Sequence, residues 1–338
     1  MNIFLNFQLF INNASLIFPR TLVNAIYAYS LYCIGFVICL GTLGESSVGP
    51  LLFWITLGLY LHGVVTYYRV IKIGPGFTSS HSNLLRLTED NQAPDFLINN
   101  GTQELHICKK CDLYKPPRAH HCSSCNACVL KMDHHCPWFA LCIGSQNYKL
   151  FIQFLLMSLI FAVWSCAISG WYVWRFIAEE SYTDEYMDLN VIINGVIALS
   201  MSVSLAVFDG VEMYFLLKGM TTIEYYEKSD FNRDVDVFSG SMMSSKEEED
   251  SLKWRNIFDT GSVRDNWEVV MGTTLWEWLL PVQRSTLGDI HRDEGLSFPV
   301  NKENLKIMRR NEQRLRHNNQ HSDNVRSRLL GQLSSRSD

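Results

Sequence analysis

Long runs of apolar and small uncharged residues alternate with polar segments along this chain. Four runs contain no Asp, Glu, Lys or Arg, and they cover residues 22–43, 46–68, 150–174 and 189–208. Each run is about as long as a helix needs to cross a hydrocarbon core of ~30 Å, and helices satisfy their own backbone polar groups in lipid. The alternative is a set of buried helices in a soluble protein, and four uncharged runs argue against it. The pattern predicts membrane-spanning helices at residues 22–43, 49–68, 150–174 and 189–217.

Lys and Arg are distributed unevenly among the segments that join these runs. The segment after the first run carries Glu45 and no base, and the segment after the third carries Arg175 among five acidic residues. The segment between the second and third runs is rich in bases, namely Arg69, Lys72, Arg86, Lys109, Lys110, Lys115, Arg118, Lys131 and Lys149. Because basic segments stay on the cytosolic side, both termini and the segment between the second and third spans are predicted to face the cytosol.

The non-spanning segments differ from one another in composition. The chain is 47% hydrophobic and only 19% charged, and no internal repeat is evident. Its end is polar and rich in Arg, which is typical of a disordered tail with some attraction to anionic lipid, and no nucleic-acid partner is expected. We divide these parts into an N-terminus (1–21), a connector (69–104), a cysteine-rich domain (105–149), a segment with an acidic linker (218–253), a tryptophan-rich region (254–281) and a basic tail (282–338).

Two acidic residues interrupt the apolar pattern near the end of the last span. Asp209 and Glu212 stand one helical turn apart. An acidic side chain inside a membrane is a functional candidate by default, but both stand close enough to the cytosolic end to reach the interface. No role follows for either residue from the sequence.

Seven of the ten cysteines lie between Cys108 and Cys142, in a spacing typical of zinc binding. Clustered cysteines in the reducing cytosol are metal ligands or catalytic groups more often than disulfides. A C-x2-C pair supplies two zinc ligands from one tight turn, and the chain has two such pairs, Cys108/Cys111 and Cys122/Cys125. The spacing leaves the other ligands open: the candidates are His121, Cys128, His135 and Cys142, with Cys125/Cys128 as a third possible pair and His106, His120 and His134 also available. We predict two structural zinc sites.

One thiol, that of Cys136, is left over when two four-ligand sites are filled. Pro137 follows it and favours an extended conformation for Cys136. Side chains alternate along an extended segment, so His134 lies on the face of Cys136 and His135 points the other way, as a zinc ligand would. A Cys–His pair favours the thiolate, and a third polar group that fixes the imidazole completes such a site. Asp133 can be that third group only if a turn precedes His134. The alternative role for Cys136 is that of one more zinc ligand.

These motifs resemble the DHHC cysteine-rich domain of protein S-acyltransferases, the palmitoyltransferases. The resemblance rests on HCSSCNAC at residues 121–128, DHHCPW at 133–138, CIG at 142–144 and Asn147-Tyr148. It extends to four spans with the domain between the second and third, to TTIE at residues 221–224 for the family's TTxE motif, and to residues 256–272 for its C-terminal motif. Ala140-Leu141 departs from the usual Asn-Asn, and Gly74-Pro75-Gly76 from Asp-Pro-Gly; both variants resemble a vacuolar subgroup of budding yeasts.

The resemblance implies an enzyme, a palmitoyl-CoA:protein-cysteine S-acyltransferase in which Cys136 is the acylated nucleophile, His134 its base and Asp133 the group that holds His134. The implied zinc sets are Cys108, Cys111, His121 and Cys128 for one site and Cys122, Cys125, His135 and Cys142 for the other. The implied supporting residues are Thr221, Thr222, Glu224 and Asn266. Contacts with acyl-CoA are expected at Lys109, Lys115, Arg118, Trp138 and, toward the end of the acyl chain, Phe161, for which plain helix packing is the alternative.

The expected reaction transfers a long-chain acyl group from acyl-CoA to the enzyme and then to a cytosol-facing cysteine of a membrane or peripheral protein. The resemblance implies the vacuole membrane as the location, with the ER or Golgi as the alternative. A zinc scaffold that recruits cytosolic proteins is the rival function, but a scaffold needs neither a surplus thiol nor a base. A thiol oxidoreductase would need a metal-free resolving cysteine, and none is obvious.

Overall fold

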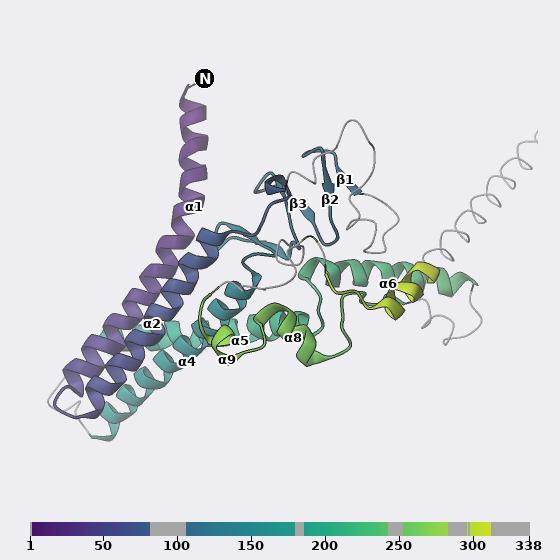
Figure 1. Ribbon diagram of the computed structural model, residues 1–338. Coiled ribbons are helices and arrows are strands. Elements are labelled where there is room, and N and C mark those ends of the chain that lie inside the picture. The colour runs from purple at the N-terminus through teal and green to yellow at the C-terminus, as the bar shows by residue number, and fades with distance from the viewer. Residues whose placement is uncertain are drawn as a thin grey trace, which may run out of the picture.

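A bundle of four long apolar helices forms the main body of the protein (Figure 1). The computed structural model describes residues 2–81, 106–179, 186–242, 253–282, 296 and 298–311. The first span combines the end of α1 (Asn2–Leu31) with the π-helix η1 (Tyr32–Thr42). The other spans are α2 (Val48–Ile73), α4 (Tyr148–Ala178) and α5 (Leu189–Leu217). All are long and apolar enough to cross a membrane, so the prediction of a multi-pass membrane protein with four spans is confirmed.

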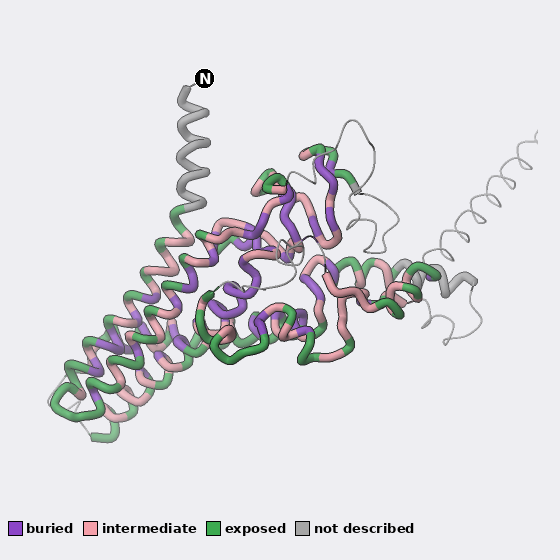
Figure 2. Tube along the Cα trace, viewed as in Figure 1, coloured by how far each residue is buried: buried purple, intermediate pink, exposed green. Residues whose placement is uncertain are grey.

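Polar side chains join the helices inside this bundle. The hydroxyls of Tyr27 and Ser158 lie 2.7 Å apart, which links the first span to α4. Asn194 of α5 accepts a hydrogen bond from Ser30 at 2.8 Å and donates one to Ser169 at 3.1 Å. Such bonds hold membrane helices together because lipid provides no hydrophobic drive between them. The outward faces of the bundle are exposed, whereas buried residues concentrate where the helix ends meet the cysteine-rich region (Figure 2).

Three short antiparallel hairpins lie between α2 and α4 at one end of the bundle (Figure 1). They pair β1 (His106–Cys108) with β2 (Leu113–Lys115), β3 (His120–Cys122) with β4 (Ala127–Val129), and β5 (His134–Cys136) with β6 (Leu141–Ile143). The last residues of the three first strands are Cys108, Cys122 and Cys136, at a spacing of 14 residues. The expectation of no internal repeat is therefore wrong, because each hairpin is one copy of a 14-residue unit.

The three hairpins also turn in the same way. Asp112, Asn126 and Ala140 occupy the same place in the repeat, and their φ angles are 52°, 50° and 52°. A positive φ is uncommon outside glycine, and Asn and Asp tolerate it better than other residues. The backbone is thus repeated more closely than the side chains are.

The C-terminal segments pack on the same end of the bundle as the hairpins. α6 (Thr222–Met242) follows α5, and α8 (Val263–Met271) and α9 (Leu275–Leu279) lie near the ends of α4 and α5 (Figure 1). Gln153 of α4 fixes α9, because its Nε2 donates to the carbonyls of Glu277, Trp278 and Leu280 at 3.1, 2.8 and 2.9 Å. Most of the connector, most of the acidic linker and most of the basic tail lie outside the described residues, so the division of the chain into those segments stays a prediction.

Candidate functional site

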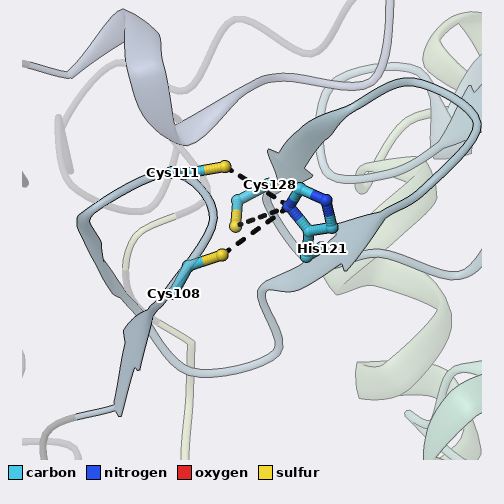
Figure 3. Close-up of side chains that lie close together, drawn as sticks. All are labelled: Cys108, Cys111, His121 and Cys128. Carbon is cyan, nitrogen blue, oxygen red and sulfur yellow. Dashed lines mark hydrogen bonds between the residues drawn. The ribbon is translucent and has the colours of Figure 1, made fainter.

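Three cysteines and one histidine form the first cluster of metal-ligating side chains (Figure 3). Its members are Cys108, Cys111, His121 and Cys128. The three sulfurs point at Nδ1 of His121 from distances of 3.6, 3.3 and 3.8 Å. Zinc bonds of about 2.3 Å to sulfur and about 2.0 Å to nitrogen, at tetrahedral angles, set such ligands about 3.6 Å apart. The donor set and its spacing therefore fit a closed structural zinc site.

A second cluster has the same composition and nearly the same dimensions. It consists of Cys122, Cys125, His135 and Cys142. The sulfurs lie 3.6, 3.4 and 3.6 Å from Nδ1 of His135, and the Sγ atoms of Cys125 and Cys142 lie 3.5 Å apart. Two Cys3His clusters consistent with two zinc sites are thus present, as predicted. Their membership is the one that the family resemblance implied and that spacing alone left open.

The repeat explains how the ligands are shared between hairpins. Each C-x2-C turn is completed by the next hairpin, which supplies a His and a Cys that face each other across the strand pair, as His121 does Cys128 and His135 does Cys142. The third hairpin has Cys136 at the first position of the turn but Phe139 at the second. It is followed by α4 instead of another hairpin. Cys136 therefore lies outside both clusters.

Asp133 and His134 form a hydrogen-bonded pair next to Cys136 in sequence and space. Nδ1 of His134 lies 2.6 Å from Oδ2 of Asp133. The turn that the sequence required before His134 is present, since Lys131 has a φ of 42° and Asp133 precedes β5. Burial opposes the charged imidazole, but the hydrogen bonds and charges of Asp133 and Cys136 outweigh it and raise the pKa of His134 to about 10. The arrangement can take a proton from a thiol on this face.

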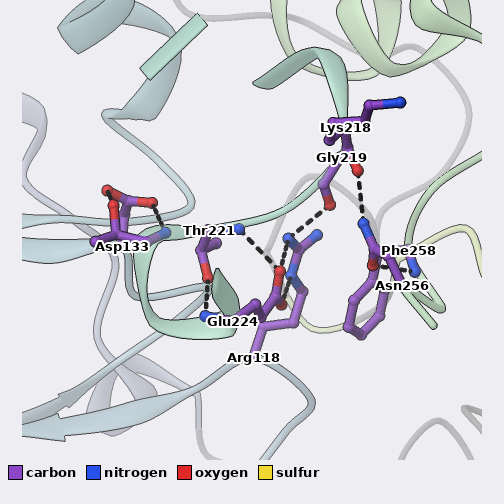
Figure 4. Close-up of polar contacts among 9 residues, drawn as sticks. Arg118, Asp133, Lys218, Gly219, Thr221, Glu224, Asn256 and Phe258 are labelled. Carbon is purple, nitrogen blue, oxygen red and sulfur yellow. Dashed lines mark hydrogen bonds and ion pairs between the residues drawn. The ribbon is translucent and has the colours of Figure 1, made fainter. Parts of the chain in front are cut away.

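The beginning of α6 holds the carboxylate of Asp133 (Figure 4). The backbone N–H of Thr222 donates to Oδ1 at 2.9 Å, and its hydroxyl donates to Oδ2 at 3.0 Å. A helix N-terminus also favours a negative charge near it. Thr221 does not bond to Asp133: its backbone N–H donates to the carboxylate of Glu224 at 2.8 Å, and its hydroxyl accepts from the backbone N–H of Glu224 at 3.3 Å.

Arg118 joins the hairpin region to the segments after α5 (Figure 4). Its Nε and Nη2 donate to the two carboxylate oxygens of Glu224 at 2.6 and 2.8 Å, and Nη2 also donates to the carbonyl of Gly219 at 3.1 Å. The guanidinium lies 4.3 Å from the ring centre of Phe258 and 5.1 Å from that of Phe298. The two charged side chains are 6% and 7% exposed. Arg118, expected to contact acyl-CoA, is therefore engaged in a buried ion pair.

Asn266 of α8 ties the C-terminal motif to the end of α5. Its Nδ2 donates to the carbonyl of Leu217 at 3.0 Å and to Oδ1 of Asp259 at 2.8 Å. Its Oδ1 accepts from the backbone and the hydroxyl of Thr260 at 3.1 and 3.0 Å. These bonds stabilise the segment that leads into α6, and thereby Thr222.

The remaining residues expected to contact acyl-CoA occupy different surroundings. Lys109 is exposed and Lys115 is half-buried. Trp138 is 54% exposed, and its carbonyl accepts a hydrogen bond from the hydroxyl of Tyr67 at 2.8 Å. Phe161 is buried inside the bundle, where its ring stacks on Tyr27 at a centroid distance of 5.0 Å. Sequence reasoning missed Tyr27, which carries no motif.

Asp209 and Glu212 were expected near the interface, and both are buried within the protein rather than on its surface, at 6% and 3% exposed. The carboxyl of Glu212 instead lies close to Asp133 and His134, with ligating atoms of all three residues within 4.8 Å of one another. Sequence spacing carries no signal of this contact, because α5 and β5 meet only in the folded protein.

Comparisons with known proteins match the chain to palmitoyltransferases. A family model described as DHHC palmitoyltransferase matches residues 101–229. The chain is 36% identical to palmitoyltransferase PFA3 of Candida glabrata over 97% of this chain and 96% of that protein. It is 32% identical to palmitoyltransferase PFA3 of Saccharomyces cerevisiae over 79% of each chain. It is 29% identical to palmitoyltransferase PFA3 of Kluyveromyces lactis over 94% of this chain and 95% of that protein.

Proposed function

The chain belongs to the DHHC palmitoyltransferase family and is a protein palmitoyltransferase, and from this premise we propose that Cys136 carries the acyl group between the two substrates. One observation carries the proposal: Cys136 is the thiol of the hairpin region that belongs to neither Cys3His cluster, and it stands beside the Asp133–His134 pair. A thiol that is free of metal and close to a base is a nucleophile.

The proposed reaction has two thiol-exchange steps. In the first, His134 takes the proton of Cys136, the sulfur attacks the thioester carbonyl of acyl-CoA, and the CoA sulfur leaves with that proton. In the second, His134 takes the proton of the acceptor cysteine, whose sulfur attacks the acyl-Cys136 thioester, and Cys136 leaves as the thiol. Asp133 keeps the imidazole oriented throughout, through the bond of 2.6 Å to Nδ1. No net proton or electron is gained or lost.

The two zinc sites are proposed to support this chemistry structurally. Each cluster provides four protein ligands, so neither retains an open position for substrate. When bound, zinc would fix the three short hairpins, whose strands have three residues each and have little core of their own. Cys136 would then be held rigidly at the turn of the third hairpin.

The acyl chain is proposed to lie among the helices, where each buried CH2 contributes about 0.8 kcal/mol. The buried rings of Phe161 and Tyr27, with Ser158 bonded to Tyr27 at 2.7 Å, form a transverse wall between the first span and α4 that would limit acyl length. Lys109 and Lys115 are proposed to meet the anionic nucleotide of CoA. Trp138, exposed next to Cys136, would line the entrance.

The acceptors are proposed to be cysteines of membrane or peripheral proteins that face the cytosol, because the positive-inside pattern puts the hairpin region there. The resemblance to the vacuolar subgroup of budding yeasts supports a vacuolar membrane location. A fluorescent fusion should label the vacuole rim and its termini should be accessible from the cytosol; labelling of the ER or Golgi would overturn the location.

The proposal is tested with labelled palmitoyl-CoA and the purified full-length enzyme. Wild type should acquire a label that hydroxylamine removes, and Cys136→Ser should acquire none while it retains two zinc ions per chain. Cys166→Ser is the matched control, since Cys166 also lies outside both clusters, in α4, and should label like wild type. Equal labelling of wild type and Cys136→Ser would overturn the role of Cys136 and favour a zinc scaffold.

A further inference from the structure

A second carboxyl besides that of Asp133 lies at the proposed acyl-transfer centre, and the mechanism above does not use it. Glu212 of α5 is 3% exposed, and its carboxyl lies within 4.8 Å of the ligating atoms of Asp133 and His134. Its Oε2 has no hydrogen-bond partner among the residues that the structure describes. A buried carboxyl without a partner is costly, and in a membrane helix such a group is retained for a purpose.

The other side chains described around His134 are largely apolar. The imidazole is bonded to Asp133 through Nδ1, and the ring of Phe151 stands against it edge-on at a centroid distance of 5.3 Å. Phe208 of α5 packs in turn on Phe151 at 6.3 Å. The pair is therefore lined by apolar rings, and Glu212 brings a polar group to it from α5.

Two elements that are adjacent in sequence, α5 and α6, each bring a polar residue to the Asp133–His134 pair. Glu212 lies in the last two turns of α5, and Thr222, at the start of α6, donates two hydrogen bonds to Asp133. Thr222 fixes the carboxylate of Asp133 through these two bonds, and Asp133 in turn holds the imidazole through its bond to Nδ1. The reaction rate depends on how well the imidazole is oriented toward the thiol it serves, so a further polar group beside the pair can contribute to the rate.

We propose that Glu212 is a positioning residue of the acyl-transfer centre, whose carboxyl braces the Asp133–His134 pair from α5. This inference rests on the proposed roles of Cys136, His134 and Asp133. Glu212 touches neither substrate; it acts by keeping His134 in reach of Cys136. Asp209 stands one turn earlier on the same helix, is also buried, and has two unpartnered oxygens among the described residues, but it does not belong to the cluster. It serves as the matched control.

The test measures the rate of enzyme acylation in a single turnover over a range of palmitoyl-CoA concentrations. Glu212→Met keeps the length of the side chain and removes its polar atoms, and it should lower the maximal rate about 10- to 100-fold. The half-saturating concentration should change less than about two-fold, because binding of acyl-CoA is untouched. Glu212→Gln, which keeps a polar side chain of the same length, should restore most of the rate, and Asp209→Met should behave like wild type.

Wild-type rates in Glu212→Met, a loss confined to the half-saturating concentration, or an equal loss in Asp209→Met would each overturn the proposal. If Glu212→Met does not retain two zinc ions per chain, Glu212→Asp decides instead: withdrawal of the carboxyl by one methylene should slow acylation several-fold, and a wild-type rate would refute the role. Cys136→Ser separates this test from that of the proposed function, since it should abolish the label at any time, whereas the Glu212 variants should only slow its appearance.

Discussion

The first two hairpins and the third are built on one backbone but serve different chemistry. In all three, a cysteine ends the first strand and a residue with a φ near 50° follows in the turn. The second turn position is Cys111 in the first hairpin and Cys125 in the second, and both bind into a Cys3His cluster. It is Phe139 in the third, so Cys136 has lost its partner thiol. The third hairpin thus has a cysteine at a zinc-ligand position without the other ligands of a zinc site.

The difference shows how the fold can hold the turn of Cys136 in place while its thiol stays outside both zinc clusters. The zinc clusters hold the neighbouring hairpins, while Phe139, 1% exposed, fixes the third turn by packing on Tyr67 at 4.9 Å and Phe154 at 5.2 Å. An aromatic anchor thus replaces the metal as the support of that turn. A supported turn would keep the proposed nucleophile within reach of its proposed base.

The strongest way to test the contrast is to remove one cysteine from each kind of turn. Cys122→Ala should lose the second zinc and all acylation, because the free energy of zinc binding, about 10–16 kcal/mol in small metal-folded domains, is folding free energy there. Cys136→Ala should also lose acylation but keep two zinc ions per chain. Metal analysis alongside labelling distinguishes the two variants. Loss of zinc from Cys136→Ala would show that the third turn is a metal site as well.

The next largest effect is expected at the pair that serves the free thiol. Asp133→Asn should lower the acylation rate about 10³- to 10⁴-fold, because an amide cannot hold the imidazole in the same tautomer. Its zinc content should equal that of wild type, since Asp133 belongs to neither Cys3His cluster. Single-turnover labelling and metal analysis measure both quantities. A rate within a few-fold of wild type would show that Thr222 and Asp133 support the fold and not the chemistry.

A cysteine at position 139 should give the third hairpin the zinc-binding turn of the first two. Phe139→Cys recreates the C-x2-C turn and removes a buried ring, at a cost in stability of about 3–4 kcal/mol. With two thiols in the turn, added Zn²⁺ should bind Cys136 and suppress acylation. Phe139→Ala is the control, because it loses the same packing without gaining a thiol. Equal zinc sensitivity of acylation in the two variants would contradict the account.

The sequence predicted what depends on local patterns. Four spans followed from the absence of charge, and the surplus of Cys136 followed from counting ligands. The membership of the zinc sets came from family resemblance, because spacing cannot say which hairpins lie side by side. The 14-residue repeat was missed because its equivalent positions differ in chemistry: Ile107 stands where the later copies have His121 and His135.

Contacts between distant segments were beyond the reach of the sequence. Arg118 pairs with Glu224 across more than a hundred residues, and no local pattern separates a buried guanidinium from a surface one. Glu212 looked like an interfacial acid because its helix ends five residues later. Its place beside Asp133 is set by how α5 packs against the hairpins, which only the folded chain decides.

The smallest expected effect concerns the turn position with a positive φ, where the third hairpin has Ala140 and the second has Asn126. Ala140 has a φ of 52°, where a Cβ without a compensating polar group costs about 1 kcal/mol, whereas Asn126 occupies the same place with a side chain that tolerates it. Ala140→Asn should therefore stabilise the protein by about 0.5–1 kcal/mol, and Asn126→Ala should destabilise it by a similar amount. Thermal unfolding in detergent measures both, with zinc content held equal. If the two substitutions shift the unfolding midpoint in the same direction, the second and third hairpins are not equivalent at this turn position, and their equivalence is limited to the zinc-ligand positions.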